Sequence, residues 1–109
     1  MQIIRGTTPT IVINVKTDID FSQISNIWVY ISQMGLVKVN KEMQDTILDP
    51  QESTITLTLS QEDTLALTKG DALIQIRLLI ADITALATIA EHFSVEEIYK
   101  EGIIGGEFT

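Results

Sequence analysis

The chain has 109 residues, no cysteine, one histidine and a formal net charge of −8. This length suits one hydrophobic core, and the lack of cysteine excludes disulfides, thiolate catalysis and cysteine-based zinc sites. The acidity argues against binding to phosphate backbones. No stretch reaches the roughly 18 to 20 apolar residues of a membrane helix, and no signal-peptide pattern opens the chain, so we expect a cytoplasmic protein.

The first half of the chain has the pattern of short strands separated by turns. Alternation of apolar and polar residues predicts strands at residues 10–15, 24–32 and 36–41. Gly35 lies between the last two, which indicates a hairpin. A short edge segment follows at residues 46–48, before a turn that contains proline.

The second half repeats this pattern and adds one helical turn. Ser60 is placed to cap that turn, and Asp63 follows three residues later, where its carboxylate can bond back to the cap. The predicted strands of this half cover residues 54–59, 72–80 and 85–93, with the last continuing to about Ile98.

About seven short strands with turns every 8 to 12 residues or so are typical of a sandwich or barrel. We therefore predict an all-β, immunoglobulin-like antiparallel β-sandwich with one short helical turn near residues 61–67. It forms a single domain over residues 1–109, of which residues 102–109 form a flexible C-terminal tail. No helical period is long enough to cover a parallel sheet.

The histidine, His92, is the natural place to look for catalysis. A triad requires a nucleophile that a histidine activates and a third group that orients the histidine. Ser94 and Glu91 supply the residue types, but no nucleophile-elbow pattern accompanies them, and adjacent strand residues face opposite sides. We therefore predict no catalytic residue and no enzyme.

Two groups of acids were considered as metal ligands. Asp18 and Asp20 match the first positions of a calcium-binding loop, but other residues occupy its glycine and bidentate glutamate positions. Asp45 and Asp49 also lie close together in the sequence. Ordinary acidic turns are favoured, so no metal and no cofactor are predicted, and a weak site at either pair is left open.

A more informative feature is the second face of the predicted strands. If the core takes one face, Trp28 and Tyr30 lie on the other, together with Leu73, Arg77 and Leu79. Aromatic residues and arginine often anchor interfaces. These five residues are the candidate interface. The alternative is that another part of the same chain covers them.

Four segments carry a resemblance to a known group of sequences: residues 2–10, 26–33, 57–65 and 85–87. Together they resemble a family of small uncharacterised proteins that Firmicutes prophages encode near genes for tail components. The resemblance extends from Arg5 to about Ile103 and carries no site residue. It implies a phage-derived structural or tail-associated protein.

These observations combine into one functional expectation and two alternatives. We expect a non-enzymatic phage or prophage protein–protein interaction module, whose partners are other phage structural proteins or a second copy, with no nucleic acid and no membrane. Such a module is virion-associated after assembly. One alternative is a carbohydrate- or host-surface-binding module that uses Trp28 and Tyr30. The least favoured is a small hydrolase that uses His92.

Overall fold

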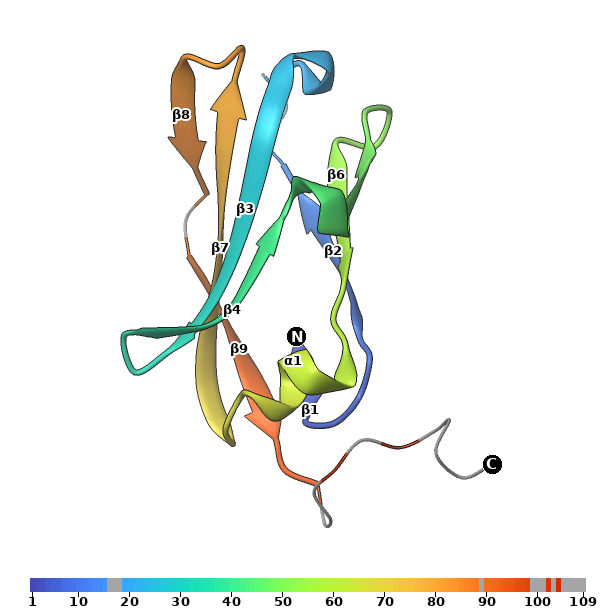
Figure 1. The fold of residues 1–109 in the computed structure, drawn as a ribbon, viewed down its shortest axis with the longest axis vertical. Coiled ribbons are helices and arrows are strands. Elements are labelled where there is room, and N and C mark those ends of the chain that lie inside the picture. The colour runs from blue at the N-terminus through green and yellow to red at the C-terminus, as the bar shows by residue number, and fades with distance from the viewer. Residues whose placement is uncertain (16–18, 89, 99–101, 103, 105–109) are drawn as a thin grey trace.

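Two β-sheets packed face to face form the fold in the computed structural model, which describes residues 1–15, 19–88, 90–98, 102 and 104 (Figure 1). The larger sheet contains, in order, β1 (Gln2–Ile4), β9 (Glu91–Glu96), β7 (Gly70–Ile80), β3 (Ile24–Gln33) and β4 (Leu36–Glu42), and β8 (Thr84–Ala87) also pairs with β7. The smaller sheet contains β2 (Thr10–Asn14), β6 (Thr54–Thr58) and β5 (Thr46–Asp49). One α-helical turn, α1 (Gln61–Leu65), and two 3₁₀ turns, η1 (Phe21–Gln23) and η2 (Met43–Asp45), complete the described elements. The predicted all-β sandwich and its helical turn are confirmed.

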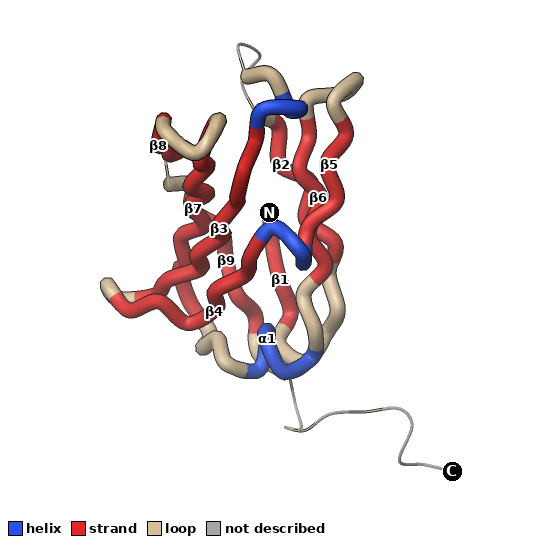
Figure 2. The backbone as a smooth tube through the Cα atoms, turned by 45° about the horizontal axis from the view of Figure 1, so that its top comes forward, coloured by secondary structure: helices blue, strands red, loops and turns tan. Residues whose placement is uncertain are grey.

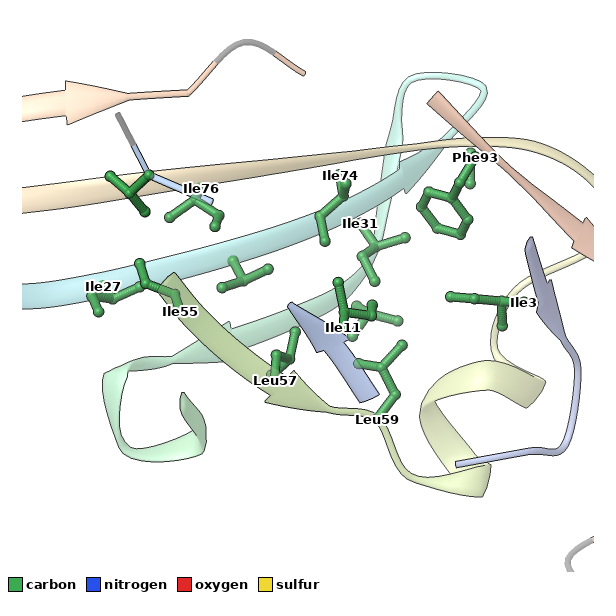
Figure 3. Close-up of a cluster of buried hydrophobic side chains, with 14 of the residues drawn as sticks. Ile3, Ile11, Ile27, Ile31, Ile55, Leu57, Leu59, Ile74, Ile76 and Phe93 are labelled. Carbon is green, nitrogen blue, oxygen red and sulfur yellow. The ribbon is translucent and has the colours of Figure 1, made fainter. Parts of the chain in front are cut away.

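Period-two patterning places the core between the sheets. On β7, buried and more exposed residues alternate along most of the strand, and β3 does the same. The two strands pair antiparallel over most of their length, so their buried faces form one continuous surface. Figure 3 shows side chains from both sheets meeting in this core, among them Ile11, Ile27, Ile31, Ile55, Leu57, Ile74 and Ile76.

One end of the sandwich is closed by α1 (Figure 2). Ser60 and Asp63 form a complete capping box, with Asp63 N–H donating to Ser60 Oγ at 3.0 Å and Ser60 N–H donating to the Asp63 carboxylate at 2.8 Å. The turn places Leu67 in the core with no exposed surface. Lys41 from β4 forms an ion pair with Asp63 at 2.8 Å, which ties the larger sheet to α1.

Arg5 holds the same end from the N-terminal side. Its Nε donates to the carbonyl of Leu67 at 2.6 Å and its Nη2 to the carbonyl of Leu65 at 2.9 Å. The guanidinium also pairs with Glu97. These acceptors satisfy the buried guanidinium. The bonds join the residue that follows β1 to the last residue of α1 and to the chain beyond it. We call the surroundings of Arg5, Asp63 and Leu67 the capped end.

The structure corrects three expectations about strands. Residues 2–4 form β1, which was not predicted and which pairs parallel to β9, so the larger sheet is not purely antiparallel. The strand expected at residues 85–93 is two strands, β8 and β9, and β9 ends at Glu96 rather than near Ile98. The flexible tail predicted for residues 102–109 lies mostly outside the described residues.

The break between β8 and β9 has a consequence for side-chain direction. Leu86 on β8 pairs with Leu78, whereas Glu91 on β9 pairs with Ile74. Between these pairs the register slips by one residue along β7. One residue of slip turns every later side chain to the other face. Glu91 therefore lies on the same inner face as Leu86, which a single unbroken strand would not allow.

Candidate functional site

The two sheets differ in size, and this leaves part of the larger one uncovered. The smaller sheet has only β2, β6 and β5 among the described residues, and β2 is one of its edges. Opposite that edge, the larger sheet continues through β8 and the start of β9. Their inner-face residues face the interior side of the sandwich but have no strand of the smaller sheet above them. The partly exposed Leu86 illustrates this, since 40% of its surface is accessible although it faces inward.

The uncovered region forms a groove along β2. Its largest part has a volume of about 530 Å³. A second hollow of about 230 Å³ continues along β2 towards Met1, and both hollows are lined by Asn14 and Glu91. We call this continuous hollow the groove. The larger part is lined by Asn14, Val15, Ile19, Leu78, Leu86, Ala87, Thr88 and Glu91.

Glu91 is the charged side chain that lines the larger part of the groove. Its register partner is Ile74, a buried core residue, so the carboxylate projects from the inner face of the larger sheet. Among the described residues it has no ion-pair partner. An exposed carboxylate at the rim of an apolar hollow attracts cations and hydrogen-bond donors.

Thr88 fixes the floor of the groove where β8 ends. Its N–H donates to the carbonyl of Ile76 at 2.9 Å, and its Oγ1 accepts the N–H of Ile76 at 3.0 Å. The side chain of Gln75 donates to the carbonyl of Thr88 at 2.9 Å. These bonds satisfy β7 across the gap between β8 and β9. The groove is therefore bounded by fixed backbone on this side.

His92 lies outside the larger part of the groove, but it lines the smaller hollow that continues towards Met1. It pairs in register with Leu73, and its Nδ1 lies 2.8 Å from the Asp71 carboxylate in an exposed contact. Adjacent residues Glu91 and His92 thus face opposite sides, as the sequence predicted. Both residues nevertheless line the smaller hollow of the groove.

The acids considered as metal ligands serve as local caps. Asp20 accepts hydrogen bonds from the hydroxyl of Ser22 at 2.6 Å and from its N–H at 2.9 Å, which lower the pKa of Asp20. Asp45 accepts from the N–H of Glu42 at 3.0 Å. Asp49 likewise accepts from two backbone N–H groups in the turn that follows it. Asp18 lies outside the described residues. Across the part of the chain that is described, no group of three or more acidic or histidine side chains is arranged to hold a metal ion.

The five residues of the candidate interface share the outer face of the larger sheet. Trp28 pairs with Arg77, and Leu73 lies farther along β7 opposite Ser32. A shallow hollow of about 180 Å³ is lined by Trp28, Tyr30, Arg77, Leu79 and neighbouring residues, but not by Leu73. The structure therefore gathers four of the five into one patch and separates the fifth. Whether a partner binds there stays a prediction.

Sequence reasoning missed the groove residues Asn14, Leu86, Thr88 and Glu91. In the sequence, Glu91 stands out only as the neighbour of His92. The signal that identifies these residues is the register slip, and residues 88–90 contain no glycine, proline, asparagine or aspartate to mark it. The size difference between the sheets depends on long-range pairing and has no local signature.

Comparisons with known proteins support the fold. No family model matches the chain and no curated protein matches it. Among solved structures, the chain is similar to CopC from Methylosinus trichosporium OB3b, with a TM-score of 0.51 and 14% sequence identity. The likeness covers 93% of this chain and 89% of that chain. At this identity the likeness shows the β-sandwich fold alone.

This comparison corrects the functional expectation. The similar structure is CopC, not a phage tail or virion component. The expectation of a phage or prophage structural module, with its carbohydrate-binding and hydrolase alternatives, is therefore wrong. The resemblance to prophage proteins on which it depended stays a prediction, because no comparison tests it.

Few residues of this chain are of the types that hold a transition metal such as copper. Copper sites in proteins are built mainly from imidazole and sulfur ligands. This chain has one histidine, three methionines and no cysteine. The histidine, His92, contacts Asp71, and it lines the smaller hollow of the groove together with Met1. The described residues place no third donor of the histidine, cysteine or acidic type beside this pair.

The partner and location expectations stay predictions. Within the described residues, none of the helices has the length and apolar character needed to cross a membrane.

Proposed function

We propose that this protein is a non-enzymatic binding domain whose groove takes a ligand with an apolar body and a cationic group. The observation that carries the proposal is the Glu91 carboxylate, which has no ion-pair partner among the described residues and lies on the inner face of an otherwise mainly apolar hollow. Ligand sites are commonly hollows of about 300 to 1,000 Å³, mostly apolar, with a few polar groups that fix orientation. The groove has this size and composition.

The chemistry of the lining defines the ligand. Val15, Leu78 and Leu86 provide apolar contact, and Glu91 provides one negative charge. Asn14 and Thr88 add neutral hydrogen-bonding groups beside it. A ligand with an ammonium or guanidinium group next to an aliphatic segment satisfies all of these contacts. An anionic ligand does not, because it would lie against Glu91 in a chain of net charge −8.

The test uses hexylammonium as a probe. Hexanol is the control that keeps the alkyl chain without the charge, and methylammonium is the control that keeps the charge without the long alkyl chain. Backbone amide chemical shifts are followed during titration. A probe of this size binds in the millimolar range at best, and we expect hexylammonium to bind about threefold to fivefold more tightly than hexanol. In Glu91→Gln this difference should vanish, whereas Glu52→Gln, which removes an exposed carboxylate outside the groove, should keep it. Equal binding of hexylammonium and hexanol to the wild type would contradict the proposal.

A further inference from the structure

The free edge of β2 is the feature that the proposed ligand class leaves unexplained. Val15 N–H donates to the carbonyl of Ser53 at 2.8 Å, just beyond the last pair of the β2–β6 ladder. Residues of an antiparallel strand bond alternately to one neighbour and to the other side. The N–H and C=O groups of Thr10, Val12 and Asn14 therefore point away from β6, to the edge that faces the groove.

Within the part of the chain that the structure describes, this edge lacks the features that usually protect an edge strand. Such strands commonly carry lysine, an internal proline, a bulge or a covering segment. β2 has the sequence Thr-Ile-Val-Ile-Asn, pairs with β6 without a register shift, and contains no charge and no proline. Val12 is 58% exposed on it. β2 is thus competent to accept another strand.

The sandwich also has space for such a strand. In immunoglobulin constant-type sandwiches, a sheet of four strands faces a sheet of three. Here β1 pairs with β9 in the larger sheet, so β2 remains an edge of a three-stranded sheet. A fourth strand beside β2 would lie about 4.8 Å from it and over the uncovered inner face at Leu86, Thr88 and Glu91.

We propose that the groove takes an extended segment of a partner polypeptide, added beside β2 as a fourth strand of the smaller sheet, with one lysine or arginine facing Glu91. This inference rests on the proposed function and names its ligand. Main-chain hydrogen bonds to Thr10, Val12 and Asn14 supply binding energy, and alternate side chains fill the groove. The basic residue is selected because Glu91 has no ion-pair partner among the described residues.

The test uses a capped peptide of sequence Thr-Val-Thr-Lys-Thr-Val-Thr, the lysine peptide, and a counterpart with norleucine in place of lysine. We expect the wild type to bind the lysine peptide about fivefold more tightly than the norleucine peptide. Glu91→Gln should bind the two peptides equally. Binding is measured by fluorescence anisotropy. Amide hydrogen exchange should slow at Val12 and Asn14 when the peptide is bound.

Backbone N-methylation supplies the matched control. Two versions of the lysine peptide are methylated at alternate residues, one at the odd and one at the even positions. Only one set of N–H groups faces β2, so one version should lose more than tenfold in affinity while the other stays within about twofold. Val12→Pro removes an edge N–H that does not bond to β6, so it should weaken peptide binding more than tenfold. Val12 does not line the larger part of the groove, so hexylammonium binding there should stay within about twofold.

The outcomes separate the two proposals. If hexylammonium binds but the lysine peptide does not, or if both methylated versions bind alike, strand addition is wrong and the binding groove stands. If neither probe binds, both proposals are wrong. Amide hydrogen exchange at Val12 could also slow without peptide as the protein concentration rises. If it does, and sedimentation shows a dimer, a second copy of the chain occupies the edge of β2 and the proposed partner is wrong.

Discussion

The capped end and the groove show two ways of finishing the same sandwich. At the capped end, Arg5, α1 and the Lys41–Asp63 ion pair cover the core and satisfy the exposed backbone. At the groove, one edge of β2 pairs with none of the described strands, and the inner face of β8 stays accessible. The first arrangement contributes to stability. The second leaves apolar surface and backbone groups open, which favours a binding role.

The largest expected effect on the free energy of unfolding comes from shortening a leucine in each of the two regions. Leu67 is fully buried at the capped end, whereas Leu86 is 40% exposed in the groove. Leu67→Ala should lower the free energy of unfolding by about 2 to 5 kcal/mol, because it removes buried contacts and leaves a cavity. Leu86→Ala should cost below about 1 kcal/mol. Urea denaturation of both variants checks this, and equal losses would remove the contrast between the regions.

The next effect concerns the buried arginine. Arg5→Met leaves the carbonyls of Leu65 and Leu67 without the donors that they have in the wild type. Each buried group that loses its partner costs about 1 to 3 kcal/mol, so we expect a loss of about 3 kcal/mol. The exposed Arg77→Met is the matched control and should change stability by no more than about 0.5 kcal/mol. A small effect for Arg5→Met would mean that water replaces the guanidinium.

The capping box predicts a pH dependence. Burial of the Asp63 carboxyl raises its pKa, but hydrogen bonds from Lys41 and Ser60 and the Lys41 charge outweigh this, so the pKa lies below its ordinary value. A lowered folded-state pKa gives stability that is present above about pH 4 and is lost as the pH falls through the folded-state pKa.

This dependence is measured by comparing the wild type with Asp63→Asn in urea between pH 7 and pH 2. At pH 7 the variant should be less stable by about 1 kcal/mol, as is typical for the loss of a cap. The difference should shrink as the pH falls below about 4. A difference that stays constant over this range would show that the charge of Asp63 does not contribute.

The smallest stability effect is expected in the groove. Glu91→Gln should change the free energy of unfolding by no more than about 0.5 kcal/mol, because the carboxylate is exposed and has no ion-pair partner among the described residues. The same urea experiment measures it, with Glu52→Gln beside it. A clear loss in Glu91→Gln alone would indicate a structural role for this side chain and would weaken the case for a binding site.

Much of the fold could be predicted because its rules are local. Period-two alternation identified β2 through β7, and the pairing of Ser60 with Asp63 identified α1. The break between β8 and β9 could not be predicted, because the residues around Thr88 are compatible with one continuous strand. β1 was missed because three residues carry too little pattern, and its parallel pairing with β9 is set by the whole chain.

The site was less predictable than the fold for the same reason. Glu91 belongs to the inner face only because the register along β7 slips by one residue, which no local pattern records. The outer-face patch of Trp28 and Tyr30 follows directly from alternation, so sequence reasoning found it first. Local alternation identifies the faces of a strand, but it does not show which part of a face stays uncovered.

The most direct test of the central claim, that the groove is the binding site, is the map of backbone amides whose chemical shifts change when hexylammonium is titrated. We predict changes at Asn14, Leu86, Thr88 and Glu91, with Leu59 and Leu67 at the capped end unaffected. Changes centred on the outer face at Trp28 and Tyr30, or spread evenly over the molecule, would contradict the account.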